Sequence, residues 1–306
     1  MVKITVLGSF NMDLVMRAER RPLAGETLQG DFAMHLGGKG FNQAVAARRL
    51  GADVAITGRV GDDEFGRAFL AALDRDGLDR CAVVTDPTAG TGVASIVVEP
   101  DGANTILQDP RANRGLTAAD VAAPALFDAA AVAMLQLETS MSAAIELARR
   151  ARAAGATTLL NPAPAAAVPE ALLALTDILV PNEIEARTLT GAADHGIDAA
   201  FGMAAALLQR GPRAVVLTLG EHGAVLADAT QRIHVPRFDV HAVDTVGAGD
   251  AFCAALAVRI AEGAPLADAV RFANAAGAVA TTRPGAEPSM PHRHEVESLL
   301  SRGVPA

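Results

Sequence analysis

The sequence has 306 residues, of which 51% are hydrophobic and 20% charged, so the chain can bury a large core and is neither disordered nor fibrous. Its 26 basic and 35 acidic residues give a net charge of −9, which disfavours a nucleic-acid partner. There is no Trp and no Tyr, so no ligand can be held by stacking on those rings.

The cellular compartment is predicted from the thiols and the apolar runs. Cys81 and Cys253 are the only cysteines, too few for a disulfide framework, which is typical of a reducing cytoplasm. Residues 1–8 have the pattern of a first strand and not of an export signal, and the longest apolar stretches end before they reach membrane-spanning length. We therefore expect a cytoplasmic protein.

Short runs of Val, Ile and Leu alternate along the chain with longer helical patterns. The predicted buried strands are residues 2–8, 54–60, 132–137, 157–161, 177–181 and 214–219. The predicted helices are residues 42–50, 65–73, 142–154, 184–189, 199–209 and 253–260. Candidate C-cap glycines are Gly51, Gly77, Gly155, Gly191 and Gly211. This alternation predicts an α/β fold, a doubly wound and mainly parallel sheet flanked by helices on both faces.

Two stretches interrupt that alternation, at about residues 11–36 and 90–111. Both contain alternating or β-branched segments without an intervening helix, and residues 100–102 form a turn signal between two such segments. They predict antiparallel hairpins that together form a small β-sheet lid, discontinuous in sequence and able to cover a ligand. We expect the lid to belong to one domain that covers residues 1–306.

The strongest candidate for a chemical site is the small-residue segment 242–252, followed by an apolar helix. Glycines allow close backbone approach, and the free N–H groups at a helix start can hold a phosphoryl group or an oxyanion. Asp250 stands where a base is needed. Since Asp is also a favoured N-cap residue, a capping role for Asp250 is equally compatible with the sequence.

A second glycine cluster, residues 36–44, also precedes a helix. It lacks the spacing of a phosphate-binding P-loop, because Ala33 occupies the first glycine position and Gly40 follows Lys39. No dinucleotide fingerprint follows the first strand. The cluster is either an ordinary turn or, through Lys39 and Asn42, a site that binds hydroxyl groups.

Polar side chains also follow the predicted strands. They are Asn11, Asp13, Glu138, Asn182, Glu185 and Thr218, the last followed by Gly220. Ligands of open parallel sheets bind at the carboxyl ends of the strands, so we expect these groups to line one edge.

Eight segments together resemble the ribokinase branch of the PfkB-type carbohydrate kinases over essentially the whole chain. They are residues 11–13, 37–42, 61–66, 135–138, 161–164, 181–185, 218–220 and 244–250. The stretches Gly-Gly-Lys-Gly-Phe-Asn and Asp-Thr-Val-Gly-Ala-Gly-Asp look like the two signatures of that family. The resemblance implies a ribokinase-like fold and ATP-dependent phosphorylation of the 5-hydroxyl of D-ribose.

The resemblance also implies a role for each matching residue. The sugar ligands would be Asn11, Asp13, Gly38, Lys39, Asn42, Glu138 and Asp250. The nucleotide site would be lined by Asn182, Thr218, Gly220, Gly223, Gly249 and Asn274. Asp250 would be the general base, the amides of Gly247, Ala248, Gly249 and Asp250 an anion hole, and Glu185 would organise Mg²⁺ through water.

A monovalent-cation site and a subunit interface are implied in the same way. The ligands of K⁺ would come from Asp244, Val246, Ala280, Arg283, Gly285 and Ser289. Pro284 would end the preceding helix and leave carbonyls such as that of Ala280 free; the alternative is a plain turn. Exposed lid strands would pair in a homodimer.

Two residues depart from the family pattern. Arg111 stands where a glycine is usual, either as a solvated surface residue or at the mouth of the lid, and Phe41 replaces a smaller residue in the sugar loop. A PfkB-type kinase for a nucleoside or another sugar is one alternative, which the absence of Trp and Tyr disfavours for a nucleoside. A non-catalytic sugar- or nucleotide-binding regulator is another, which the intact Asp250 disfavours.

Overall fold

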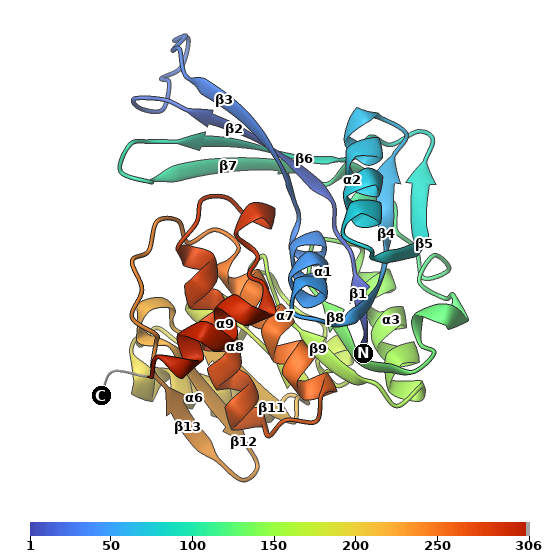
Figure 1. The fold of residues 1–306 in the computed structure, drawn as a ribbon, viewed down its shortest axis with the longest axis vertical. Helices are drawn as coiled ribbons and strands as arrows, with labels where there is room; N and C mark the ends of the chain where they lie inside the picture. The colour runs from blue at the N-terminus through green and yellow to red at the C-terminus, as the bar shows by residue number, and fades with distance from the viewer. Residues whose placement is uncertain (304–306) are drawn as a thin grey trace.

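The computed structural model describes residues 1–303, which form one large sheet between two helical layers and a second, small sheet (Figure 1). The strands of the large sheet are β1 (Lys3–Leu7), β4 (Asp53–Gly61), β5 (Asp79–Asp86), β8 (Ala130–Leu135), β9 (Thr157–Leu160), β10 (Ile178–Leu179), β11 (Ala214–Thr218), β12 (Ala224–Asp228) and β13 (Arg232–Val235). Their order is β13-β12-β11-β10-β9-β8-β1-β4-β5, and only the pairs that involve β12 are antiparallel. The doubly wound, mainly parallel α/β fold is thus confirmed.

The helices are α1 (Lys39–Arg49), α2 (Glu64–Arg75), α3 (Met141–Ala153), α4 (Glu170–Leu173), α5 (Glu183–Thr190), α6 (Ile197–Leu208), α7 (Ala248–Ala261), α8 (Leu266–Thr281) and α9 (Arg293–Ser301). Four short 3₁₀ turns are η1 (Arg111–Gly115), η2 (Pro124–Leu126), η3 (Gly220–His222) and η4 (Glu287–Ser289). Of the expected C-cap glycines, only Gly191 is the C-cap residue of its helix. Each of the other four lies one or two positions after the C-cap residue of its own helix. None of the helices within residues 1–303 is long and apolar enough to cross a bilayer.

The two largest hydrophobic cores of residues 1–303 lie on opposite faces of the large sheet, because successive side chains of a strand point to opposite faces. On β8, Val132 and Met134 pack with residues of α1, α7 and α8, whereas Ala133 and Leu135 pack with residues of α3 and α6. Burial on both faces explains why these strands read as continuous apolar runs in the sequence.

The small sheet, here called the lid, extends from the large sheet at the top of the view in Figure 1. Its strands are β2 (Asn11–Arg17), β3 (Asp31–Gly37), β6 (Gly92–Val98) and β7 (Asn104–Asp109), in the order β3-β2-β6-β7. The hairpins β2–β3 and β6–β7 are antiparallel as predicted, and β2 and β6 join them by parallel pairing. The lid is therefore assembled from two distant segments of chain.

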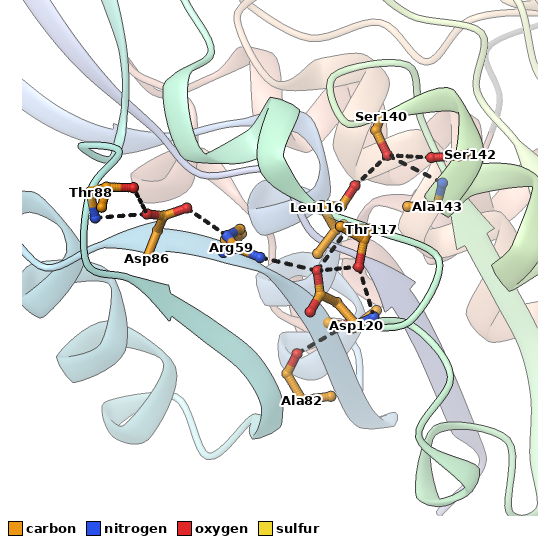
Figure 2. A network of polar contacts seen from close by, with 11 residues as sticks. Arg59, Ala82, Asp86, Thr88, Leu116, Thr117, Asp120, Ser140, Ser142 and Ala143 are labelled. Carbon is orange, nitrogen blue, oxygen red and sulfur yellow. Dashed lines mark hydrogen bonds and ion pairs between the residues drawn. The ribbon is translucent and has the colours of Figure 1, made fainter.

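A polar network fixes the chain where it returns from the lid to the large sheet (Figure 2). Arg59 on β4 donates to Asp86 Oδ2 at 2.8 Å and to Asp120 Oδ2 at 3.2 Å. Asp120 also accepts the backbone N–H of Thr117 at 2.8 Å, and Ser140 donates to the Leu116 carbonyl. Amide donors, first those of Ala89 and Thr88, hold the pKa of Asp86 well below its usual value, so the carboxylate that faces Arg59 stays charged.

Candidate active site

A cavity of about 210 Å³ lies at the carboxyl ends of the central strands, beside the start of α7. Its lining includes seven residues singled out from the sequence: Lys39, Asn182, Glu185, Thr218, Gly247, Gly249 and Asp250. A larger, open groove of about 780 Å³ lies under the tip of the lid and is lined by none of the predicted site residues. The smaller cavity is therefore the candidate site.

Two glycines allow helix starts to approach the cavity. Gly38, before α1, has φ +98°, and a Cβ there would lie 2.3 Å from the Ser9 carbonyl oxygen. Gly247 is the N-cap of α7 with φ +79°, and a Cβ there would lie 2.6 Å from the Met290 methyl group. Side chains at either position would push the helix start away, so these turns require glycine.

Asp250 lies in the first turn of α7 and is 6% exposed. Its Oδ2 accepts Asn42 Nδ2–H at 3.0 Å and its Oδ1 accepts Gln43 Nε2–H at 3.0 Å. The N-cap is Gly247, so the alternative that Asp250 caps the helix is wrong. Burial raises the pKa of Asp250, and Lys39, Asn42 and Gln43 counteract that rise. A buried carboxylate with a raised pKa has the chemistry that a proton acceptor needs.

A second group of charges surrounds Glu138, which follows β8. Glu138 Oε2 accepts the Ser9 hydroxyl at 2.6 Å and the backbone N–H of Lys39 at 2.8 Å. Gln108, on the lid, approaches Glu138 Oε1 at 3.5 Å. Burial, followed by Glu138 and Asp250, raises the pKa of Asp13 to about 7. Lid and body thus contribute acidic groups to the same place.

Lys39 is the cation that compensates these carboxylates. Burial alone lowers the pKa of its amine, but Asp250, Glu138 and Glu185 raise it above its usual value. The amine therefore stays charged at neutral pH and offsets part of the negative charge of the site.

Two buried amide atoms have no hydrogen-bond partner within residues 1–303. They are Asn11 Nδ2, a donor, and Asn42 Oδ1, an acceptor. The other end of each amide is engaged, since Asn113 donates to Asn11 Oδ1 at 3.0 Å and Asn42 donates to Asp250. Buried polar groups are rarely left unpaired, so these atoms are suited to a ligand that both donates and accepts, such as a hydroxyl.

Glu185 and Asn182 form a capping box at the start of α5. Asn182 Oδ1 accepts the Glu185 N–H at 2.8 Å, and Glu185 Oε2 accepts the Asn182 N–H at 2.9 Å. Glu185 is 4% exposed, and burial raises its pKa. Residues 1–303 contain no cluster of three or more His, Cys, Asp or Glu that could hold a metal ion directly. A cation here could use Glu185 only singly or through water.

The expected monovalent-cation ligands come from the loop before α7 and from the end of α8 with the segment that follows it, and these two parts of the chain meet beside Gly247. Asp244 accepts the N–H of Val246 at 3.0 Å and that of Gly285 at 2.9 Å, which joins the loops. The Ser289 hydroxyl donates to Ala286 O at 2.8 Å, and Arg283 pairs with Glu295 at 3.0 Å. The Ala280 carbonyl oxygen accepts the Arg283 N–H at 3.4 Å, a long hydrogen bond that uses one of its two lone pairs, so its role as a cation ligand stays a prediction.

Three of the expected nucleotide residues do not line the cavity: Gly220, Gly223 and Asn274. Asn274 donates to the carbonyls of Val235 and Pro236 at 2.9 and 3.2 Å. A Cβ at Gly223 would lie 2.2 Å from the Val235 carbonyl oxygen. Both residues therefore lie next to the end of β13, at an edge of the large sheet.

The two departures from the family pattern have separate structural outcomes. Phe41 is fully buried and packs against Phe10 and Phe69, with ring centroids 6.2 and 5.0 Å away, so its ring points into the core. Arg111 has φ +40°, in the left-handed region, and its side chain extends past Gly90 near the base of the lid. Phe41 thus does not line the cavity, whereas Arg111 takes a backbone conformation suited to glycine.

Several residues of the site had no assigned role in the sequence. Asn161, Thr245 and Cys253 line the cavity, Gln43 binds Asp250, and Ser9 binds Glu138. Asn161 and Thr245 belong to the motifs that carried the resemblance, and Gln43 directly follows one of them, so their position beside assigned residues was the available signal.

Comparison with known proteins gives one consistent result. Residues 1–293 match the model of the pfkB family carbohydrate kinases. The chain is 40% identical to a ribokinase of Schizosaccharomyces pombe, covering 98% of each chain, and 35% identical to a deoxyribokinase of Salmonella typhi, covering 97% of this chain and 98% of the relative. The solved ribokinase of Arabidopsis thaliana, complexed with ribose and ATP, superposes with a TM-score of 0.91 at 32% identity, covering 98% of this chain and 99% of that one.

Proposed function

The chain belongs to the pfkB family of carbohydrate kinases, and we propose that it transfers the γ-phosphoryl group of ATP to the 5-hydroxyl of D-ribose, giving ribose 5-phosphate and ADP. One observation carries the choice of site: buried Asp250, at the start of α7, lies next to Asn42, whose Oδ1 has no partner within the described residues. A proton acceptor thus stands beside an unfilled hydroxyl-binding atom and a helix N-terminus. The two relatives support ribose and its deoxy form as the sugars to compare.

The proposed step is an in-line displacement. The 5-hydroxyl oxygen attacks the γ-phosphorus, the bond from that phosphorus to the β–γ bridging oxygen breaks, and ADP leaves with the bond's electron pair. The hydroxyl proton passes to a carboxylate oxygen of Asp250. The backbone amides of Gly247, Ala248, Gly249 and Asp250 stabilise the charge on the transferred group, because the dipole of α7 points its positive end there.

The remaining polar residues divide between sugar and nucleotide. Asn11, Asp13, Gly38, Lys39, Asn42 and Glu138 bind the sugar hydroxyls, and the lid formed by residues of about 11–36 and 90–111 covers them within one domain. Asn182, Thr218, Gly220, Gly223, Gly249 and Asn274 bind the nucleotide. The unpartnered atoms of Asn11 and Asn42 support the first group, and the position of Thr218 and Gly249 on the cavity wall supports the second.

Two cations complete the proposal. Glu185 would hold Mg²⁺ through water, since the described residues include no cluster of three or more potential metal ligands, and an ion held there would neutralise charge on the phosphates. Asp244, Val246, Ala280, Arg283, Gly285 and Ser289 would surround K⁺. The hydrogen bond from Gly285 N–H to Asp244, which joins the two segments beside Gly247, supports that second site.

A homodimer through the lids is the proposed assembly, in the reducing cytoplasm that two free cysteines favour. Strand register places Met16, Phe32, Met34 and Leu107 on the lid face opposite Asp13, and they are 38–78% exposed. Such an apolar face is a liability unless it is covered. Light scattering should show a dimer, and Phe32→Glu should give a monomer; a monomeric wild type would contradict the assembly.

The decisive experiment combines a substrate panel with Asp250→Asn. We expect ADP release with ribose to exceed that with deoxyribose, fructose and nucleosides, and we expect Asp250→Asn to lower kcat at least about 100-fold while ATP binding stays near wild type. Asp268→Asn is the matched control, since Asp268 is an exposed carboxylate in the first turn of α8. Near-normal turnover of Asp250→Asn would refute the base. No turnover with any sugar would favour a binding regulator.

A further inference from the structure

The side chain of Gln43 lies behind the proposed base and has no part in the mechanism above. It comes from α1, is fully buried and does not line the cavity. Its Nε2 donates to Asp250 Oδ1 at 3.0 Å and to Asn161 Oδ1 at 3.3 Å. We infer that Gln43 is a positioning residue that fixes the Asp250 carboxylate for proton acceptance, and that Gln136 in turn fixes Gln43. The inference rests on the proposed role of Asp250.

The orientation of the Gln43 amide is determined by its other neighbour. Gln136, directly after β8, is 2% exposed, and its Nε2 donates to Gln43 Oε1 at 2.5 Å. With Oε1 turned to Gln136, the Gln43 NH₂ group must face Asp250. The opposite orientation would set an amide oxygen against a carboxylate and two NH₂ groups against each other, both without hydrogen bonds in a buried site.

This arrangement controls how the carboxylate of Asp250 presents its lone pairs. Each oxygen accepts one amide N–H, Oδ1 from Gln43 and Oδ2 from Asn42. Asn42 is also a proposed sugar ligand, so its contact is shared with the substrate. Gln43 does not line the cavity, so its hydrogen bond to Asp250 is not shared with the substrate. It therefore holds the plane of the carboxylate and favours the ionised form that a base requires.

The other titratable groups around Asp250 come from several elements and are the same in a Gln43 variant. They are Lys39, Asp13, Glu138, Glu185 and Cys253. Removing only the Gln43 amide leaves their charges unchanged. A change in the titration of Asp250 can then be assigned to the lost hydrogen bond.

The test replaces each glutamine by methionine, which keeps the length of the side chain and removes its polar atoms. For Gln43→Met we expect kcat to fall about tenfold, the acidic limb of the kcat profile to move up by about one pH unit, and KM for ribose to stay within about threefold. Gln136→Met should also lower kcat and move the acidic limb of the kcat profile to higher pH, but both changes should be smaller than in Gln43→Met. Gln231→Met is the control, because Gln231 donates to Asp228 Oδ2 at 2.8 Å in the turn between β12 and β13, and it should match wild type.

A second readout does not depend on turnover. NMR of protein labelled with ¹³C at the Asp carboxyl carbons identifies the Asp250 resonance as the one that Asp250→Asn removes. In Gln43→Met and Gln136→Met, that resonance should titrate at higher pH than in the wild type. If kcat, the pH profile and the Asp250 titration of Gln43→Met all match those of the wild type, the inference is overturned. If Gln43→Met does not fold, the same measurements on Gln136→Met decide. Failure of the wild type to phosphorylate ribose would refute the proposed function alone, since the titration still reports on Gln43.

Discussion

Replacing Asp13 by Asn should stabilise the protein by an amount that grows with pH. Burial, with Glu138 and Asp250 nearby, raises the pKa of Asp13 from 3.8 to about 7. Because the folded-state pKa is above the unfolded one, stability is lost as pH rises from about 4 through 7. At about 1.4 kcal/mol per pKa unit, the raised pKa costs the fold about 2 kcal/mol at pH 5 and about 4 kcal/mol at pH 8, because the unfolded chain ionises this carboxyl more readily than the folded one does.

The assay is urea unfolding of wild type and Asp13→Asn at pH 5, 6 and 8, followed by circular dichroism. Subtracting the two proteins at each pH cancels the titrating groups that do not interact with Asp13, so the advantage of the variant should increase by about 2–3 kcal/mol across this range. Asp31→Asn, at an exposed carboxylate on β3, is the control and should show no such trend. A constant difference between Asp13→Asn and wild type would refute the reasoning. The same variant should bind ribose more weakly, because it loses a charged acceptor.

Three further predictions concern the base of the lid and the cation loops. Ser9→Ala removes a hydroxyl that donates to Glu138 and accepts the Gly40 N–H at 3.0 Å, so KM for ribose should rise about tenfold; an unchanged KM would show that Ser9 does not position Glu138. Arg111→Gly should raise the free energy of unfolding by about 1 kcal/mol over Arg111→Ala, since only glycine relieves φ +40°, and equal stabilities would show no strain. Replacing K⁺ by tetramethylammonium at constant ionic strength should lower kcat, and an equal rate would argue against the cation loops around Asp244.

The sequence predicted the buried centre of the fold well and its edges poorly. Strands such as β1, β4 and β8 are covered on both faces, so their sequences are uninterrupted apolar runs. The edge strand β5 and the hairpin β12–β13 were not predicted. Most residues of β5 are at least partly exposed. A turn separates β12, which ends in a polar residue, from β13, which begins with one. Both features weaken the apolar pattern by which strands are predicted.

At the site, the sequence identified the residues with charges but not those that orient them. Asp250, Glu138 and Lys39 stood out because each follows a strand or a glycine turn. Gln43 and Ser9 did not, because their roles depend on contacts with residues 207 and 129 positions away along the chain. Spacing within a motif cannot show such partners, which the folded sheet brings together.

The parallel pairing of β2 with β6 has a consequence for protein engineering. Seven residue pairs, from Asn11–Gly92 to Arg17–Val98, join two hairpins that are separated in the sequence by α1, β4, α2 and β5. The lid therefore cannot be exchanged one hairpin at a time. If one hairpin came from a relative, β2 and β6 would come from different parents and would have to pair along all seven residue pairs in the middle of the lid. Exchanges of specificity between such kinases should therefore move both hairpins together, so that the paired residues of β2 and β6 come from a single parent.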